Sequence, residues 1–305
     1  MVGVRTIAIV VGVVAGMLAA GSGRAQGPVD AATFDWSGVV PAGAVVRIAD
    51  ADGNISVAPG SGNAVQVHGS RTHVLSGGRA LVFEVVKSGN DVTICARHPS
   101  GECTSEGEHG GRVRMTQVGH SPAADFTVQL PAGVKLAAST SDGRVDIRDA
   151  GADVVAKTGD GEIRVVGAAG TVDAHSGDGD ITLEGVKGEV SAHTGDGHIR
   201  VTTASGPLNL TSGDGDIEVH VASLSDGQSL TAHTGDGNVT LYVPANFTGS
   251  IDATTGDGSL ESDFPVTTTG RMNAHHLEGT IGNAGERAAR VSVSTGDGNV
   301  MLRRS

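Results

Sequence analysis

The chain has 305 residues and a formal net charge of −13, with 34 acidic and 21 basic side chains. This excess of acid argues against binding to nucleic acid or anionic lipid surfaces, because their phosphate groups attract Lys and Arg. Cationic partners and metal ions remain compatible with it. Only five Phe, one Trp and one Tyr are present, which argues against sugar binding by stacked aromatic rings.

The first 25 residues have the pattern of a secretory signal peptide. Arg5 precedes an uncharged apolar stretch over residues 6–20, and Ala25 supplies a small residue before a cleavage point at Gln26. Cleavage there removes two Arg and changes the net charge from −13 to −15, by −13 − 2 = −15. The alternatives are cleavage near Ala20 and an uncleaved anchor. No later segment is apolar enough to span a membrane, so we expect an exported protein of the periplasm, cell envelope or extracellular space.

Residues 26–135 are predicted to form an irregular β cap at one end of the protein. Within this region, residues 46–57 read as a divergent copy of the repeat that follows. Cys95 and Cys103 are the only cysteines of the chain. In an oxidising compartment an isolated pair that flanks a Pro-Ser-Gly turn predicts a disulfide. A metal site with the nearby His98 and His109, or two free thiols, are the alternatives.

Residues 136–305 carry the strongest pattern of the sequence, a tetrapeptide Thr/Ser-Gly-Asp-Gly that recurs at a nearly fixed interval. From Asp142 to Asp214 each step between successive Asp residues is 18 residues. Later steps are 22, 21 and 40 residues, and His276-Leu277-Glu278-Gly279 resembles a degenerate copy inside the longest gap. A fixed period near twenty residues indicates stacked units. The sequence therefore predicts an all-β solenoid, a β-helix-like stack of short strands.

Apolar residues at every second position flank each tetrapeptide, which is the period of a strand with one buried face. Each unit is then a rung of two short strands joined at Gly-Asp-Gly, whose glycines we expect to supply positive φ angles. Rungs stacked about 4.8 Å apart bury the faces of their neighbours. Two inward columns are expected on the strand before the turn. The bulky column is Leu136, Val154, Val172, Val190, Leu208, Leu230, Ile251, Met272 and Val291. The small column is Ala138, Ala156, Ala174, Ala192, Ala232, Ala253 and Ala274.

The stack also predicts a ladder of carboxylates along the turns. Its expected members are Asp142, Asp160, Asp178, Asp196, Asp214, Asp236, Asp257, Glu278 and Asp297. Like charges one rung apart repel each other, by roughly 1 kcal/mol per pair in water. Hydrogen bonds from turn N–H groups or from the neighbouring Thr/Ser hydroxyl would offset this repulsion. The alternative is a cation ladder with calcium between the rungs, although each turn offers only one acid.

A second column holds histidines, each directly before the Thr or Ser of its turn. His175, His193, His233 and His275 occupy it, and their side chains are expected to point outward. An exposed polar ladder is one interpretation. The other is a transition-metal site shared by His175 and His193, the only contiguous pair.

The residues carry a resemblance to a known family. The signal peptide, the Val-Pro-Ala-Gly segment at residues 40–43, the Ile-Cys-x-x-x-Pro segment at residues 94–99 and the Gly-Asp-Gly-x-Ile-x-Val rungs are its marks. Together they resemble the exported bacterial β-repeat family named "putative adhesin", over residues 35–305. The resemblance implies an envelope or surface location and an adhesive role. It brings no catalytic residues and no cofactor with it.

From these features we expect a non-enzymatic cell-envelope protein that acts as an adhesin or protein-interaction module. An accessory protein of envelope stress or signalling and a cation-binding structural protein are the alternatives. Catalysis needs one organised pocket, whereas the residue types of a His-Ser-Asp triad recur here in several rungs of the stack. An enzyme with a pocket around His98, His109 and His120 is a further alternative. Pairing between solenoid ends, through a last rung ending at Val300–Leu302, would allow oligomers.

Overall fold

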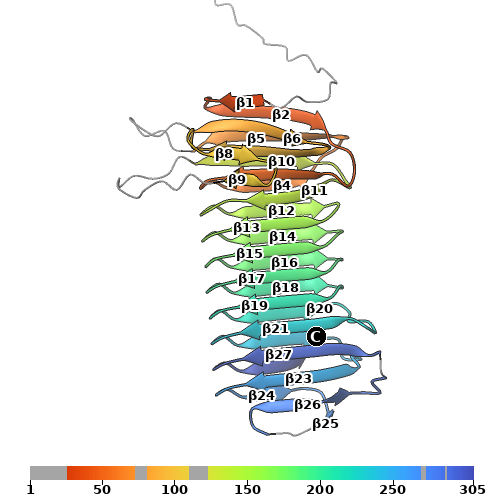
Figure 1. Ribbon diagram of the computed structural model, residues 1–305. Coiled ribbons are helices and arrows are strands. Elements are labelled where there is room, and N and C mark those ends of the chain that lie inside the picture. The colour runs from red at the N-terminus through yellow and green to blue at the C-terminus, as the bar shows by residue number, and fades with distance from the viewer. Residues whose placement is uncertain (1–25, 73–80, 110–122, 269–272, 286) are drawn as a thin grey trace, which may run out of the picture.

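The computed structural model describes residues 26–72, 81–109, 123–268, 273–285 and 287–305, and these residues form strands and no helix. Two long sheets lie face to face along one axis, and short turns connect them (Figure 1). The all-β solenoid expected from the sequence is confirmed. The predicted signal peptide lies outside the described residues. The described part of the chain contains no helix long and apolar enough to cross a membrane.

The first sheet has 14 strands, most of them parallel. In spatial order these are β1 (Gln26–Val29), β6 (Val82–Ser88), β7 (Asp91–Arg97), β3 (Val45–Asp50), β11 (Lys135–Ser139), β13 (Val154–Thr158), β15 (Val172–Ser176), β17 (Val190–Thr194), β19 (Leu208–Ser212), β21 (Ser229–Thr234), β27 (Ala289–Thr295), β23 (Gly249–Thr255), β26 (His276–Ile281) and β25 (Val266–Thr268).

The second sheet has 12 strands and faces the first. Its spatial order is β2 (Thr33–Val39), β5 (Ala64–Arg71), β10 (Ala124–Leu130), β4 (Ile55–Pro59), β12 (Val145–Ala150), β14 (Ile163–Ala168), β16 (Ile181–Val186), β18 (Ile199–Ala204), β20 (Ile217–Val221), β22 (Val239–Val243), β28 (Val300–Arg304) and β24 (Leu260–Ser262). The small strands β8 (Glu102–Thr104) and β9 (Gly107–His109) pair with each other near the cap.

A regular rung consists of one strand from each sheet. In β13 and β15, Val154 pairs with Val172 and Ala156 with Ala174, so the 18-residue period of the sequence becomes the step between neighbouring strands. The inward side chains are almost completely buried, and the Val, Leu and Ile side chains of one sheet pack against those of the other. Both inward columns are therefore confirmed for the regular rungs. Met272 lies outside the described residues, and Ala274 is exposed, contrary to expectation.

Aromatic side chains close the two ends of this aliphatic interior. Phe34 stacks on Phe83 with ring centroids 5.1 Å apart, and Phe83 meets Phe126 edge to face at 5.9 Å. At the other end Phe247 and Phe264 make an edge-to-face contact at 6.4 Å. A terminal rung has no neighbour to cover its apolar face, so large rings take over that role. The few aromatic residues of the chain are thus concentrated where the stack stops.

The order of the last rungs differs from the order of the chain. Strands β27 and β28 insert between β21 and β22 on one side and β23 and β24 on the other, as the colours in Figure 1 show. Leu230 therefore pairs with Val291, and Val291 with Ile251. The expectation that Val300–Leu302 forms a free edge is wrong, because β28 has a partner on each side.

The expected degenerate turn at residues 276–279 is also wrong. These residues belong to strand β26, which runs antiparallel to β23 and pairs Asp252 with Glu278. Leu277 and Gly279 face the interior, so the segment alternates as a strand does. Its four residues lack the first glycine of the Thr/Ser-Gly-Asp-Gly motif. As a strand, the segment pairs its backbone with β23, so it does not need the close contact between rungs that the turn glycines allow. Glu278 consequently does not belong to the carboxylate ladder.

Positive φ angles occur at a different corner from the one we expected. Among the described residues, the Gly-Asp-Gly glycines all lack them. In four successive rungs of the middle of the stack they occur instead one strand later, at the equivalent positions Asp149, Gly167, Gly185 and Thr203. The glycines of the tetrapeptide are required for a different reason, which is close contact between rungs.

Replacing Thr203 by glycine is expected to raise the free energy of unfolding by about 0.5–1 kcal/mol. Thr203 has a φ of 55°, a left-handed conformation that costs a β-branched residue more than it costs glycine. Its side chain is exposed, so little packing is lost. Urea denaturation provides the measurement. Thr182→Gly, in the interior of β16, is the control and should destabilise the protein. An equal loss in both variants would contradict the strain at Thr203.

Candidate functional site

The threonine or serine of each turn is a buried clamp between rungs. The Thr158 hydroxyl donates a hydrogen bond to the Gly143 carbonyl of the preceding rung, at 3.0 Å. It accepts a second bond from the Gly161 N–H of its own turn, at 3.1 Å. Ser176 repeats this arrangement with Gly161 and Gly179, each at 3.0 Å. The hydroxyl therefore joins successive turns, and it does not serve the Asp side chain as we had expected.

The bond from the hydroxyl to the neighbouring rung recurs along the described part of the stack. The remaining hydroxyls that donate to a glycine carbonyl of a neighbouring rung are Thr140, Thr194, Ser212, Thr234, Thr255 and Thr295. All of them are buried. The sequence contained a signal for this role, because the hydroxyl residue lies two positions after the small column and four after the bulky one. That spacing places it on the inward face of its strand.

The carboxylate ladder is present at the turns of the regular rungs. Asp142, Asp160, Asp178, Asp196, Asp214, Asp236, Asp257 and Asp297 are all exposed. The described residues offer these eight side chains no hydrogen bond or ion pair. Partial desolvation of the exposed Asp142 carboxylate at its turn, followed by repulsion from Asp52 and Asp160, raises the pKa of Asp142. Among the residues described, no three His, Cys, Asp or Glu side chains come together in a group that could hold a metal ion. Calcium binding along the ladder stays a prediction.

The histidine column is only partly regular. His175 and His193 stack on the outward face of the first sheet, with ring centroids 4.9 Å apart and planes 10° from parallel. Further along, His233 bonds the Ser294 hydroxyl at 2.7 Å, because β27 is the neighbour of β21. His275 lies outside the column, in the turn before β26, and is exposed. The His175–His193 pair supplies two imidazoles, and the idea that it binds a metal remains a prediction.

Cys95 and Cys103 form a disulfide in the cap, with Cα atoms 5.9 Å apart. Cys95 lies in β7 and is fully buried, whereas Cys103 lies in β8. The bridge ties the small β8–β9 hairpin to β7, an interior strand of the first sheet. His98 bonds the Ser100 hydroxyl at 2.7 Å within the loop. The His109 side chain and His120 lie outside what the structure describes.

The outward face of the second sheet carries a set of charged and aromatic side chains that the sequence analysis missed. We call this set the charged face, and its members are Arg164, Glu184, Arg200, Glu218, His220 and Tyr242. Glu218 accepts bonds from Arg200 at 3.1 Å and from the His220 ring at 2.8 Å. His220 stacks on Tyr242 with centroids 4.1 Å apart, and Arg164 lies 3.7 Å from Glu184. The sequence signal was weak: Arg164, Arg200 and Glu218 occupy the outward position of their Ile-x-Val segments, but Thr182 and Thr240 hold the same position in other rungs.

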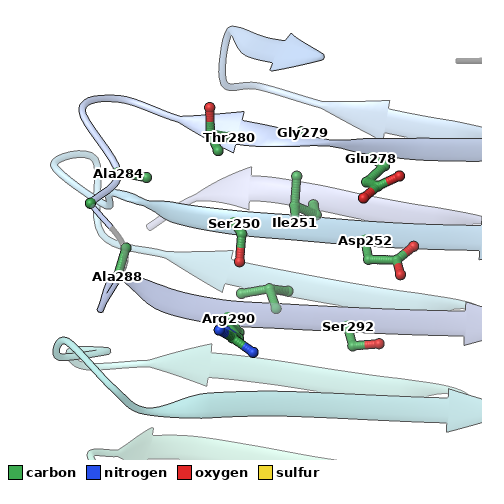
Figure 2. Close-up of a pocket in the computed structure, with 12 residues that line it drawn as sticks. Ser250, Ile251, Asp252, Glu278, Gly279, Thr280, Ala284, Ala288, Arg290 and Ser292 are labelled. Carbon is green, nitrogen blue, oxygen red and sulfur yellow. The ribbon is translucent and has the colours of Figure 1, made fainter. Parts of the chain in front are cut away.

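A pocket of about 420 Å³ lies on the outward side of the first sheet, near the end where β26 replaces a regular rung. Figure 2 shows Asp252 and Glu278 on neighbouring strands at one side and Arg290 at the other. His276 lies 3.8 Å from Asp252 and 3.9 Å from Glu278. The hollow accompanies the change from parallel to antiparallel pairing, and it lies on the sheet opposite the charged face.

These features define a two-sheet, mostly parallel β-solenoid whose turns are clamped by buried hydroxyls. A family model described as Toastrack DUF4097 matches residues 45–303, and the chain belongs to this family. The family membership expected from the repeated Gly-Asp-Gly rungs is thereby confirmed. No curated protein matches the chain significantly.

Two solved structures are similar to the chain. A putative cell adhesion protein from Clostridium sporogenes has 12% identity and a TM-score of 0.31, and the match covers 90% of this chain and 100% of that one. A putative adhesin from Bacteroides fragilis has 13% identity and a TM-score of 0.41, with coverage of 88% and 96%. Neither similarity is close enough to carry a functional conclusion.

Proposed function

We propose that the protein is a non-enzymatic, exported component of the cell envelope that binds a protein or cell-surface partner through the charged face. The observation that supports this most is that two arginines and a tyrosine lie together on the outward face of the second sheet, in contact with Glu184, Glu218 and His220. Arginine and tyrosine are the residue types most enriched at the energetic centres of protein interfaces. The outward positions of the first-sheet strands β13, β15, β17 and β19 hold neither Arg nor Tyr.

The charged face is also ordered before a partner arrives. Arg200 and His220 are both held by Glu218, and the His220 ring holds Tyr242 in a stacked arrangement. Side chains that are already fixed lose less entropy on binding than free ones do. The Arg200 side chain is 58% exposed and that of His220 is 38% exposed, so both are accessible.

Repetition is the argument for a binding role over catalysis. The turns present the same Asp side chain rung after rung, and the outward strand faces form one extended surface, which suits a long contact with a partner. Acid–base or nucleophilic catalysis requires one arrangement that differs from its surroundings. Location in the envelope is proposed from the signal-peptide pattern of the first 25 residues.

Isolated cell envelopes from the producing bacterium are the probe for this function. The full-length exported chain should bind them saturably, and Arg164→Ser combined with Arg200→Ser and Tyr242→Ser should weaken binding about tenfold or more. The matched control is Asp173→Ser with His175→Ser and Thr231→Ser on the first sheet, which should bind like the parent. Binding that does not saturate, or an equal loss in both triple variants, would contradict the proposal.

A further inference from the structure

The four sheet edges at the ends of the solenoid are not equally protected against pairing with another strand. At the end shown lowest in Figure 1, the edge strands β24 and β25 have three residues each. At the opposite end, β1 has four residues and contains Pro28, which has no N–H to donate. Short strands and proline are devices that block edge-to-edge association. Strand β2 has neither device, because it is seven residues long, Thr33–Val39, and contains no Pro.

The backbone groups on the free side of β2 can be identified. The Arg71 N–H bonds the Ala32 carbonyl at 3.0 Å, and residues of β2 pair in antiparallel register with β5. In such a ladder the hydrogen-bonding direction alternates from residue to residue. Phe34, Trp36 and Gly38 therefore direct their backbone groups to β5. The N–H and C=O groups of Thr33, Asp35, Ser37 and Val39 point to the side where the described chain places no strand.

We propose that this edge pairs with β2 of a second copy of the chain, in antiparallel register about Trp36. Thr33 then lies opposite Val39 of the other copy, and Asp35 opposite Ser37. All four residues with free backbone groups fall in hydrogen-bonded pairs, and two bonds for each pair give about eight bonds across the interface. A register that centred on Asp35 or Ser37 would place that residue opposite its own copy and reduce the number of shared pairs.

The side chains of β2 fit this arrangement. Asp35, the only charged residue of the strand, meets the neutral Ser37 and so avoids a like-charge pair. Val39 is 57% exposed and Val29 is 41% exposed, and these are the two large apolar side chains that stand out at the surface of the described residues. Both lie at this end of the solenoid. The pairing would cover Val39 with Thr33 of the other copy.

The inner face of β2 is already packed, so the edge is rigid before it pairs. Trp36 is 6% exposed and Phe34 is 5% exposed. A side chain at Gly38 would lie 2.7 Å from the Trp36 ring, which shows that the indole occupies the space above this glycine. A preformed strand avoids the entropy cost of ordering on association. This proposal is independent of the charged face, which lies on the middle rungs.

The first test uses the full-length exported chain at micromolar concentration, with its mass measured by light scattering after gel filtration. We expect a dimer. Ser37→Pro removes an N–H that points away from β5 and should give a monomer with unchanged far-ultraviolet circular dichroism, whereas Ser37→Ala should remain a dimer. A monomeric parent chain, or a dimer that survives Ser37→Pro, would overturn the proposal. A monomer whose β2 amides resist hydrogen exchange would show that the chain covers its own edge, which also overturns it.

The second test addresses the register. In the proposed pairing, residue 37 of each copy lies opposite Asp35 of the other copy, so the dimer contains two such pairs. Ser37→Asp should weaken the dimer and Ser37→Lys should strengthen it, each by about two- to thirtyfold in the dissociation constant measured by sedimentation. The strengthening by Ser37→Lys should decrease at high salt. Equal effects of the two substitutions would rule out this register.

Discussion

Replacing Gly179 by alanine is expected to lower the free energy of unfolding by about 3 kcal/mol, at the upper end for overpacked interior positions. A methyl group at this position would lie 1.9 Å from the Gly161 carbonyl oxygen and 2.4 Å from its carbonyl carbon. Both atoms belong to the backbone, so no side chain can rotate away. The rung has to move from its neighbour, which also weakens the 3.0 Å bond from the Gly179 N–H to the Ser176 hydroxyl.

Gly62→Ala is the matched control for this substitution. The nearest atom to a methyl group at Gly62 is 4.0 Å away, and its φ angle is not left-handed. We expect the stability of this variant to lie within about 0.5 kcal/mol of the parent. Urea denaturation gives the comparison, and amide hydrogen exchange reports on the altered rung, because long repeat arrays do not always unfold as one unit. Equal stability of the two variants would show that the turns tolerate a side chain.

Thr158→Val is expected to cost about 1–3 kcal/mol of stability through the loss of one hydroxyl group. The substitution keeps the shape of the side chain, which is 5% exposed. It leaves the Gly143 carbonyl without its 3.0 Å donor and the Gly161 N–H without its 3.1 Å acceptor. Polar groups left unpaired in a buried place carry the full penalty of lost hydration, which exceeds the net value of the bond.

Two controls separate the hydroxyl from other effects of this substitution. Thr158→Ser retains the hydroxyl and should lose less stability than Thr158→Val. Thr231→Val changes the same residue type on the exposed side of β21 and should be nearly neutral. Thermal and urea denaturation provide the comparison. If Thr231→Val and Thr158→Val destabilise the protein equally, the clamp contributes nothing specific.

The regular part of the fold was predictable because it depends on local alternation. The spacing of Val154 and Ala156 fixes which side of the strand is buried, and the 18-residue period fixes the register with Val172 and Ala174. The order of the last rungs was not predictable in this way. Strand β21 can pair with either β23 or β27, since both present the same apolar pattern, and the choice depends on contacts far apart in the sequence.

In the candidate sites, too, the features set by the local repeat were predictable and those set by contacts between strands were not. The position of the Asp ladder at the turns followed from the repeat. The bond from the buried Thr158 hydroxyl to the Gly143 carbonyl of the neighbouring rung was missed, because the hydroxyl was expected to donate to the Asp of its own turn. The charged face was missed as well. Its members are far from identical between rungs, so no repeat marks them, and the contacts of Glu218 with Arg200 and His220 become visible only once neighbouring strands are paired.

The position of β27 and β28 has a consequence for how the protein is made. A chain that appears N-terminus first can add rungs one after another as far as β22, each on the template left by the one before. The next units to emerge, β23 and β24, lack their neighbours until residues 289–305 arrive and wedge between them and β21–β22. Completion of the native stack is therefore a late event, and a nascent chain halted before residue 289 would either expose the ends formed by β21–β22 and β23–β24 or pair them with each other in a non-native order.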